Sequence, residues 1–200
     1  MWGLKMMSCK RPTAVLSPWV PTGLLATFLL GGLNGCTRSA GQQGTASLEL
    51  KSATFSGDAI PQANSSCNGQ DGASPELSWS APPEHTQSFA LIVFDKDSPF
   101  GFKFTHWVLY DMPPDKRELA ENVVKQEQLS DGSRQGPNDY DRIGYVGPCP
   151  PGHSAHHYVF DLYALDTKLN LPPKASKKQV LKAMKGHVLA SGKLVGQFQH

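Results

Sequence analysis

The chain has 200 residues, with 19 lysines and arginines against 17 aspartates and glutamates, and 39% of its residues are hydrophobic. The first 35 residues hold three of the basic residues and none of the acidic ones, so the remainder carries 16 basic against 17 acidic side chains. A nearly neutral chain offers no strongly basic surface, and we therefore expect no nucleic-acid partner.

The N-terminal segment has the order of an export signal. Basic residues precede an apolar run at 24–30, which is too short to span a bilayer. The sequence Leu-Asn-Gly-Cys at 33–36 then resembles a bacterial lipobox, in which the cysteine is acylated before the signal is cleaved. We predict a signal peptide at 1–35 and lipidation of Cys36, with an uncleaved N-terminal membrane anchor as the alternative. Thr37, where an aspartate would favour the inner membrane, favours the periplasmic face of the outer membrane.

Small polar residues follow the lipobox. They predict a lipidated, flexible tether at 36–47. The rest of the chain, 48–200, is enough for the core of one domain.

Apolar residues in this domain recur mostly with the period of two that is typical of β-strands. Prolines, glycines and aspartates bound the apolar runs. Because several runs are continuously apolar, we expect strands that are covered on both faces, with Trp107 and Tyr110 in the core. The predicted strands lie at 48–50, 89–94, 107–110 and 158–165.

One helix is predicted near the C-terminus. Ser176 occupies its N-cap position, and an apolar stripe at helical spacing follows, formed by Val180, Leu181, Met184, Val188 and Leu189. Residues 113–143 are rich in turn residues and predict a long surface excursion with a short helical turn around Leu119. The predicted fold is therefore mainly β, a β-sandwich with a C-terminal helix at its flank.

Two cysteines remain in the predicted domain, Cys67 and Cys149, because Cys9 belongs to the signal and Cys36 to the anchor. An even pair in an oxidising compartment favours a disulfide, which would stabilise the fold by about 2–4 kcal/mol. Free buried thiols are the alternative. The sequence leaves both open.

Two connections carry polar residues that can build one site. The segment Asp-Lys-Asp-Ser-Pro at 95–99 closes one predicted strand, and His106 opens the next. The Gly/Pro-rich segment 144–155 then delivers His156 and Tyr158 to the start of another strand. Prolines 148, 150 and 151 restrict the unfolded loop, so we expect a pocket that is shaped before a ligand arrives.

In their order and spacing, these segments make residues 47–199 resemble the phosphatidylethanolamine-binding protein family, most closely its bacterial Raf-kinase-inhibitor-like branch. The family pattern is Asp-Pro-Asp-x-Pro followed by His-Trp, and then Gly-Tyr-x-Gly-Pro-x-Pro-Pro leading into His-Arg-Tyr. The chain departs from it at Lys96, where the family usually has proline, and at His157, where it usually has arginine. The resemblance implies a Greek-key β-sandwich with short peripheral helices. The matching positions are Asp95, Asp97, Pro99, His106, Trp107, Gly144, Tyr145, Gly147, Pro148, Pro150, Pro151, His156 and Tyr158.

The resemblance also implies that Asp95, His106, His156 and Tyr158 line a small anion pocket. A carboxylate favours the protonated form of a neighbouring imidazole, so Asp95 or Asp97, paired with either histidine, can present a positive donor to an anion. The tyrosine hydroxyl and the backbone N–H groups of the loop at 147–152 can add further donors. Whether His153 in this loop contacts a ligand is left open. The predicted binding residues are Asp95, Asp97, His106, Gly147, Pro150, His156 and Tyr158.

The predicted function is that of a lipid-anchored cell-envelope protein whose pocket binds a small anion or a phospholipid headgroup. The first alternative is an interaction module or inhibitor that acts on an envelope protein, and the less favoured alternative is a hydrolase. Self-association also stays open. We expect no catalytic residue, because neither a His-Glu-x-x-His nor a Gly-x-Ser-x-Gly motif is present. His156 and His157 are adjacent in a predicted strand and point to opposite faces, so we expect no metal site, and no cofactor is predicted.

Overall fold

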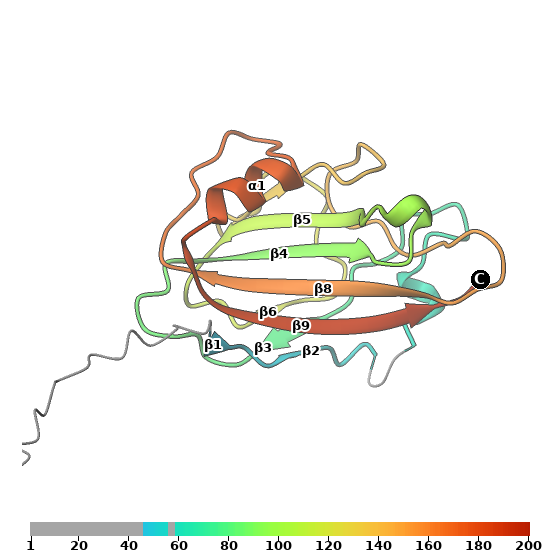
Figure 1. Ribbon diagram of the computed structural model, residues 1–200, viewed down its shortest axis with the longest axis horizontal. Coiled ribbons are helices and arrows are strands. Elements are labelled where there is room, and N and C mark those ends of the chain that lie inside the picture. The colour runs from blue at the N-terminus through green and yellow to red at the C-terminus, as the bar shows by residue number, and fades with distance from the viewer. Residues whose placement is uncertain (1–45, 56–58) are drawn as a thin grey trace, which may run out of the picture. The chain divides into compact units, whose positions relative to one another are not determined.

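The computed structural model describes residues 46–55 and 59–200, so the predicted signal peptide, the lipidation of Cys36 and most of the tether lie outside the described residues. The described chain forms two β-sheets, the helix α1 (Lys177–Met184), and the short 3-10 helices η1 (Gln62–Asn64) and η2 (Pro99–Gly101) (Figure 1). The six-stranded sheet has the order β1 (Ala46–Ser47), β9 (Val188–Phe198), β8 (His156–Leu165), β4 (Ser88–Asp95), β5 (Phe104–Met112) and β7 (Arg134–Gly136). The three-stranded sheet has the order β2 (Leu50–Lys51), β3 (Leu77–Trp79) and β6 (Glu118–Leu119).

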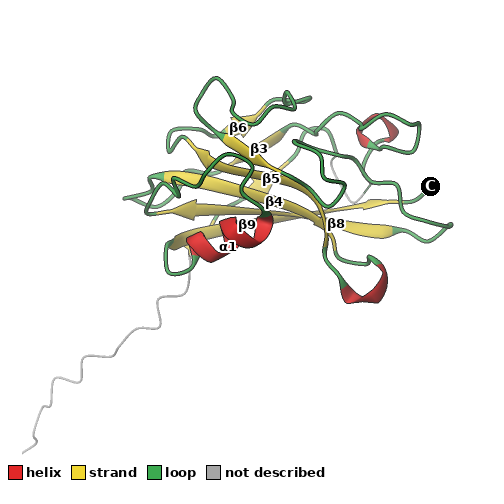
Figure 2. Cartoon of the chain, turned by 90° about the horizontal axis from the view of Figure 1, so that it is seen from above, coloured by secondary structure: helices red, strands yellow, loops and turns green. Residues whose placement is uncertain are grey.

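The two sheets pack face to face, and α1 covers the outer face of the larger one (Figure 2). Strand β4 shows why three layers form. Its Phe89 and Leu91 belong to the core that the larger sheet shares with Trp79 of the smaller sheet, whereas Ile92 packs in a second core with Val180 of α1. Because successive side chains alternate between faces, all eight residues of β4 are buried. The prediction of a mainly β sandwich with strands covered on both faces is confirmed.

Helix α1 begins where the sequence predicts. The Ser176 hydroxyl accepts a hydrogen bond from the backbone N–H of Gln179, and the Gln179 side chain accepts one from the backbone N–H of Ser176. This capping box satisfies two backbone donors that would otherwise lack partners. No helix in the described part of the chain is long and apolar enough to cross a membrane.

The predicted apolar stripe of this helix runs too far. Leu181 is exposed, and Val188 and Leu189 belong to β9. The helix ends at Met184, and Gly186, with φ of +87°, takes the left-handed conformation that lets the chain turn back along β8. The helix is therefore followed by a final long strand.

The segment 113–143 contributes to both sheets. Leu119 lies in β6 opposite Leu77 of β3, and its side chain is buried, so the predicted helical turn is wrong. Strand β7 extends the larger sheet beside β5. There the buried side-chain carbonyl of Gln135 accepts a hydrogen bond from the indole N–H of Trp107 at 2.6 Å. This partner lets a polar residue sit in the core.

The folded part of the chain begins slightly earlier than predicted. Ala46 and Ser47 form β1 and pair in parallel with Ala190 and Ser191 of β9. These two residues were assigned to the tether, but they continue the larger sheet. All other strand pairs are antiparallel among the described residues.

Cys67 and Cys149 are joined in a disulfide, with their Cα atoms 5.0 Å apart and 82 positions between them in sequence. Next to it, the backbone N–H of Ser66 donates to the carbonyl of Pro148 at 3.0 Å. The structure thus decides between the two alternatives that the sequence left open. The disulfide links the loop after η1 to the loop before β8.

Candidate functional site

A cavity of about 240 Å³ lies where β4 ends and where β5 and β8 begin. Asp95, the last residue of β4, stands opposite Phe104 of β5 and Tyr158 of β8. Side chains that face each other across antiparallel strands share one face of the sheet, so strand register brings these three together. The cavity is lined by Asp95, Ser98, Pro99, Phe104, His106, Tyr140, Cys149, Pro150, Pro151, His156 and Tyr158.

Five of the seven predicted binding residues line this cavity, namely Asp95, His106, Pro150, His156 and Tyr158. The other six lining residues were not predicted as binding residues: Ser98, Pro99, Phe104, Tyr140, Cys149 and Pro151. Phe104 lies two residues before His106 in β5, so the alternation of the strand could have identified it. Tyr140 comes from an irregular loop, and no pattern in the sequence points to it. His153 is exposed and is not a lining residue.

The centre of the site is a buried pair of an acid and an imidazole. Nδ1 of His156 lies 2.7 Å from Oδ2 of Asp95, and the two side chains are 10% and 8% exposed. The other carboxylate oxygen of Asp95 accepts the backbone N–H of Asp97 at 2.8 Å. The carboxylate thereby keeps a proton on Nδ1 of His156, and Nε2 is left as the ring nitrogen that can meet a ligand. Of the pairings that the sequence allowed, the structure selects Asp95 with His156.

His106 has a different environment. Its Nδ1 lies 2.7 Å from the carbonyl oxygen of Val146, which places a proton on Nδ1. Burial lowers the pKa of His106, although the carbonyl and the charges of Asp95 and Asp139 act in the opposite direction. The neutral ring then carries a lone pair on Nε2. His106 is therefore an acceptor at neutral pH, and not the positive donor that the sequence allowed.

Two tyrosines supply neutral hydroxyl groups. Burial raises the pKa of Tyr158, and the negative charge of Asp95 raises it further. Burial also raises the pKa of Tyr140. Both hydroxyls keep their protons at neutral pH and can donate to an anion. The ring of His106 stands edge-to-face between them, 5.1 Å from Tyr158 and 5.8 Å from Tyr140 between ring centroids.

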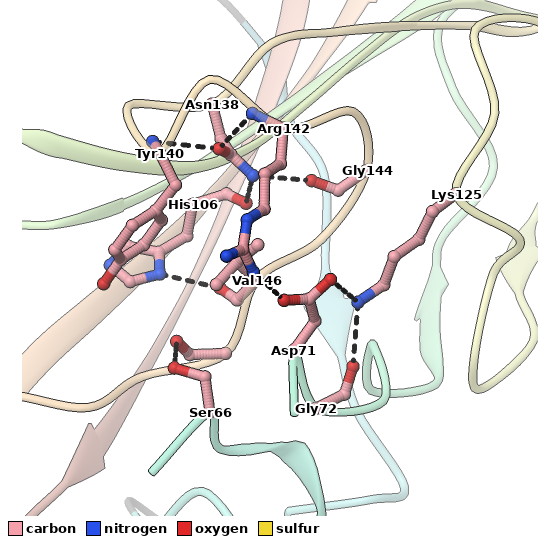
Figure 3. A network of polar contacts seen from close by, with 11 residues as sticks. Ser66, Asp71, Gly72, His106, Lys125, Asn138, Tyr140, Arg142, Gly144 and Val146 are labelled. Carbon is pink, nitrogen blue, oxygen red and sulfur yellow. Dashed lines mark hydrogen bonds and ion pairs between the residues drawn. The ribbon is translucent and has the colours of Figure 1, made fainter. Parts of the chain in front are cut away.

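Asn138 holds the loop that carries Tyr140 (Figure 3). Its side-chain carbonyl accepts the backbone N–H of Tyr140 at 3.0 Å and that of Arg142 at 3.1 Å. Arg142 in turn forms an ion pair with Asp71, which also binds Lys125 at 3.1 Å. These contacts connect one wall of the cavity to a distant loop, so the wall is positioned by the fold itself.

Gly147, one of the predicted binding residues, is not among the residues that line the cavity. Its N–H donates to the carbonyl of Asp71 at 2.8 Å, and its carbonyl accepts the hydroxyl of Ser66 at 2.9 Å. A Cβ atom at this position would collide with the carbonyl oxygen of Asn64. Glycine is needed here because two backbones pack closely, and its N–H is already used by the fold.

Asp97 also lies outside the cavity lining. His157 donates its backbone N–H to the Asp97 carboxylate at 2.9 Å, Nδ1 of its ring lies 2.5 Å from the same oxygen, and Nζ of Lys96 lies 3.2 Å from the other oxygen. Burial opposes ionisation of Asp97, but these partners outweigh it and lower its pKa to about 2. Lys96 and His157, the two departures from the family pattern, therefore bind Asp97 beside the cavity.

Within the described ranges, no three acidic, histidine or cysteine side chains gather as metal ligands.

We expect His106 to make the fold sensitive to acid. Its pKa in the folded protein lies below the ordinary value of 6.5, so the unfolded chain takes up this proton first as the pH falls. The stabilisation is complete above about pH 6.5 and declines below it, by at most about 1.4 kcal/mol per pH unit. Urea unfolding of the wild type and of His106→Asn at a series of pH values checks this, because asparagine keeps a donor for Val146 and does not titrate. A stability difference that stays constant with pH would contradict it.

A family model described as phosphatidylethanolamine-binding protein matches residues 51–199. The UPF0098 protein of Methanothermobacter thermautotrophicus is 46% identical over 152 residues, which cover 76% of this chain and 99% of that relative. A solved structure from Chlamydia trachomatis, described as a putative phosphatidylethanolamine-binding protein homolog, has a TM-score of 0.68 and 37% identity, and covers 78% of this chain and 99% of its own. The structure of Escherichia coli YbcL, described as a member of the mammalian PEBP family, has a TM-score of 0.69 and 29% identity, with the same coverage of 78% and 99%.

Proposed function

Because this chain belongs to the phosphatidylethanolamine-binding protein family, we propose that its cavity binds a small anion, with a phosphate group, free or on a phospholipid headgroup, as the preferred ligand. The observation that carries this proposal is the buried pair of Asp95 and His156. A protonated His156 can donate from Nε2 to an oxyanion, and the hydroxyls of Tyr140 and Tyr158 add neutral donors.

The charge balance of the site indicates how an anion would be held. A protonated His156 beside an ionised Asp95 forms a pair without net charge, so directed hydrogen bonds, and not a net positive field, would hold the ligand. The neutral His106 adds an acceptor nitrogen, which a protonated oxygen of inorganic phosphate or the ammonium group of an ethanolamine headgroup can satisfy. We therefore propose a binding role for the cavity and assign it no catalytic residue.

His156→Ala is expected to weaken binding by about tenfold to a hundredfold, because a lost hydrogen bond to a charged group costs about 1.5–3 kcal/mol. Calorimetry of the full chain with inorganic phosphate and with glycerophosphoethanolamine measures this and separates the two sources of the phosphate group.

His187→Ala provides the matched control. His187 also has Nδ1 2.7 Å from a carboxylate, that of Asp166, but this pair lies on the surface and outside the cavity lining. The control variant should bind phosphate as the wild type does. If His156→Ala binds as tightly as the wild type, or no longer unfolds cooperatively, the imidazole is structural and the proposed site is wrong.

We further propose that the domain is held in the cell envelope through an acylated Cys36, with the periplasmic face of the outer membrane as its location. The support is the lipobox-like sequence at 33–36 behind a short apolar run. The wild-type chain in its native host should lose residues 1–35 and gain acyl chains, and Cys36→Ser should keep the mass of the unprocessed precursor. Mass spectrometry of both forms checks this, and a mature mass that Cys36→Ser leaves unchanged would rule the anchor out.

A further inference from the structure

The outer face of the larger sheet, which α1 partly covers, holds an acidic side chain among apolar ones. Asp161 of β8 stands opposite Ile92 of β4 and Lys193 of β9, and residues opposite each other in antiparallel strands share one face. Its neighbours on this face of β8 are Val159 and Tyr163, which belong to the second core or pack against it. An aspartate in such surroundings needs an explanation, because a buried charge is costly unless it is paired.

The carboxylate of Asp161 makes no hydrogen bond of ordinary length among the described residues. Its side chain is only 16% exposed, yet the Tyr163 hydroxyl donates to Oδ2 at 3.4 Å, and Nζ of Lys193 lies 3.6 Å from Oδ1. Hydrogen bonds from hydroxyl or ammonium groups to carboxylates are normally shorter, about 2.5–2.9 Å. Lys193 is 62% exposed, and an ion pair with so exposed a lysine contributes little. The carboxylate therefore has room for a closer donor.

Asp161 and Tyr163 line two cavities on this face. The cavity of about 370 Å³ extends toward β1 and β9, and the smaller one, of about 100 Å³, extends toward the start of α1. Neither shares a lining residue with the cavity at the end of β4. The outer face thus has a candidate site of its own. Its smaller cavity is completed by Ile92, Phe94, Lys103, Lys177 and Leu181.

The smaller cavity contains charges of both signs. The ammonium group of Lys177 is already used, because it donates to the hydroxyl of Thr105 at 2.6 Å and to the carbonyl of Lys103 at 2.9 Å. Nζ of Lys103 instead stands over the ring of Phe94, 4.9 Å from its centroid, and can meet a ligand. The two lysines repel a ligand that carries only an ammonium group, and Asp161 repels one that carries only a carboxylate. A small ligand that carries both groups matches the cavity.

We propose that this site binds a free aliphatic α-amino acid, with leucine as the probe. Its ammonium group donates to Asp161, and its carboxylate accepts from Lys103. Its side chain packs against the apolar part of the cavity, formed by Ile92, Phe94 and Leu181. The small size of this cavity favours a short aliphatic side chain. The inference goes beyond the proposed function and does not depend on it, because the two sites have no lining residue in common.

Calorimetry of the full chain with leucine and three comparison compounds tests the ligand class. Isopentylamine is leucine without the carboxylate, and isocaproate is leucine without the ammonium group. Each should bind about tenfold to a hundredfold more weakly than leucine, because each loses a hydrogen bond between charged groups. Glycine keeps both charges and should bind about a hundredfold more weakly, because it buries no aliphatic side chain.

Two substitutions test the residues. Asp161→Asn keeps the shape of the side chain and should weaken leucine binding about tenfold to a hundredfold. Lys103→Met keeps the apolar part of the lysine and should bind leucine only as tightly as it binds isopentylamine. Asp166→Asn is the matched control, because Asp166 also follows the apolar part of β8 but pairs with His187 on the surface and lines neither cavity. It should bind leucine as the wild type does.

The absence of saturable heat with leucine would overturn the inference. So would leucine binding that Asp161→Asn or Lys103→Met leaves unchanged, or comparison compounds that bind the wild type as tightly as leucine. If thermal unfolding shows that Asp161→Asn does not fold, the wild type with the comparison compounds and Lys103→Met decide the question. Titration with inorganic phosphate separates the two sites: Lys103→Met should bind it as the wild type does, and a wild type that binds leucine but no phosphate removes only the proposed function.

Discussion

Replacing Cys67 and Cys149 together by alanine is expected to lower the free energy of unfolding by about 4 kcal/mol. The disulfide joins positions 82 residues apart, and the unfolded chain regains the freedom of that long loop when the link is lost. For a domain of about 150 residues, the loss corresponds to a fall in Tm of about 8–16 °C. Thermal unfolding followed by circular dichroism measures the change.

Reductant supplies the control for this comparison. It should bring the Tm of the wild type close to that of the double variant and leave the variant unchanged. Alkylation gives an independent answer, because Cys67 and Cys149 should resist labelling in the folded, unreduced protein. Stoichiometric labelling under those conditions would show free thiols and contradict the disulfide.

Gly147→Ala is expected to cost about 3 kcal/mol of stability, the upper end of the usual penalty for overpacking. The added Cβ would collide with the backbone of Asn64 and Ser65, which cannot move aside as the end of a flexible side chain can. Gly152→Ala is the control in the same loop. Its Cβ would meet no atom within 4 Å, so only the strain of its φ of +77° remains, about 1–2 kcal/mol.

Urea unfolding of both glycine variants tests the packing role. If Gly147→Ala is no less stable than Gly152→Ala, the close contact between the two loops is not needed for the fold. If Gly147→Ala keeps its stability and loses phosphate binding, Gly147 belongs to the binding site after all, as the sequence suggested.

The parts of the fold that the sequence predicted well are those set by local pattern. The run at 89–94 is long and continuously apolar, and it forms the middle of β4. Ser176 and Gln179 stand three apart, which is the spacing of a capping box, and α1 starts there. In both cases the information lies within a few neighbouring residues.

Strand β9 escaped prediction because its sequence lacks a strand pattern. Gly192, Lys193 and Gly196 interrupt the apolar residues, and glycine is poorly represented in strands. In the structure, pairing with a neighbouring strand makes this segment a strand although its residues have a low β-propensity. β9 pairs with β8 from Phe198 opposite His156 to Val188 opposite Leu165, so partner strands supply the order that the local sequence lacks. The short strand at Leu119 depends in the same way on its pairing with β3.

In the candidate site, too, the residues that local pattern places were predicted, and those that contacts with distant segments place were not. His156 begins β8 and His106 lies near the start of β5, and these positions in the chain were enough to bring both histidines to one end of the sheet. The packing role of Gly147 could not be predicted, because its neighbours Asn64 and Ser65 lie more than 80 positions away in sequence. Tyr140 was missed because its position depends on the side chain of Asn138. Contacts between distant loops leave no periodic trace in a single sequence.

The order of the larger sheet has a consequence for how the protein behaves when it is concentrated. Its two edge strands, β1 and β7, span only two and three residues, and the long strand β9 is covered near both ends, where Leu48 donates to Ser191 and Ile60 donates to Gln197. Few unpaired backbone groups are therefore presented to a strand of another molecule. Edge-to-edge aggregation is disfavoured by this construction.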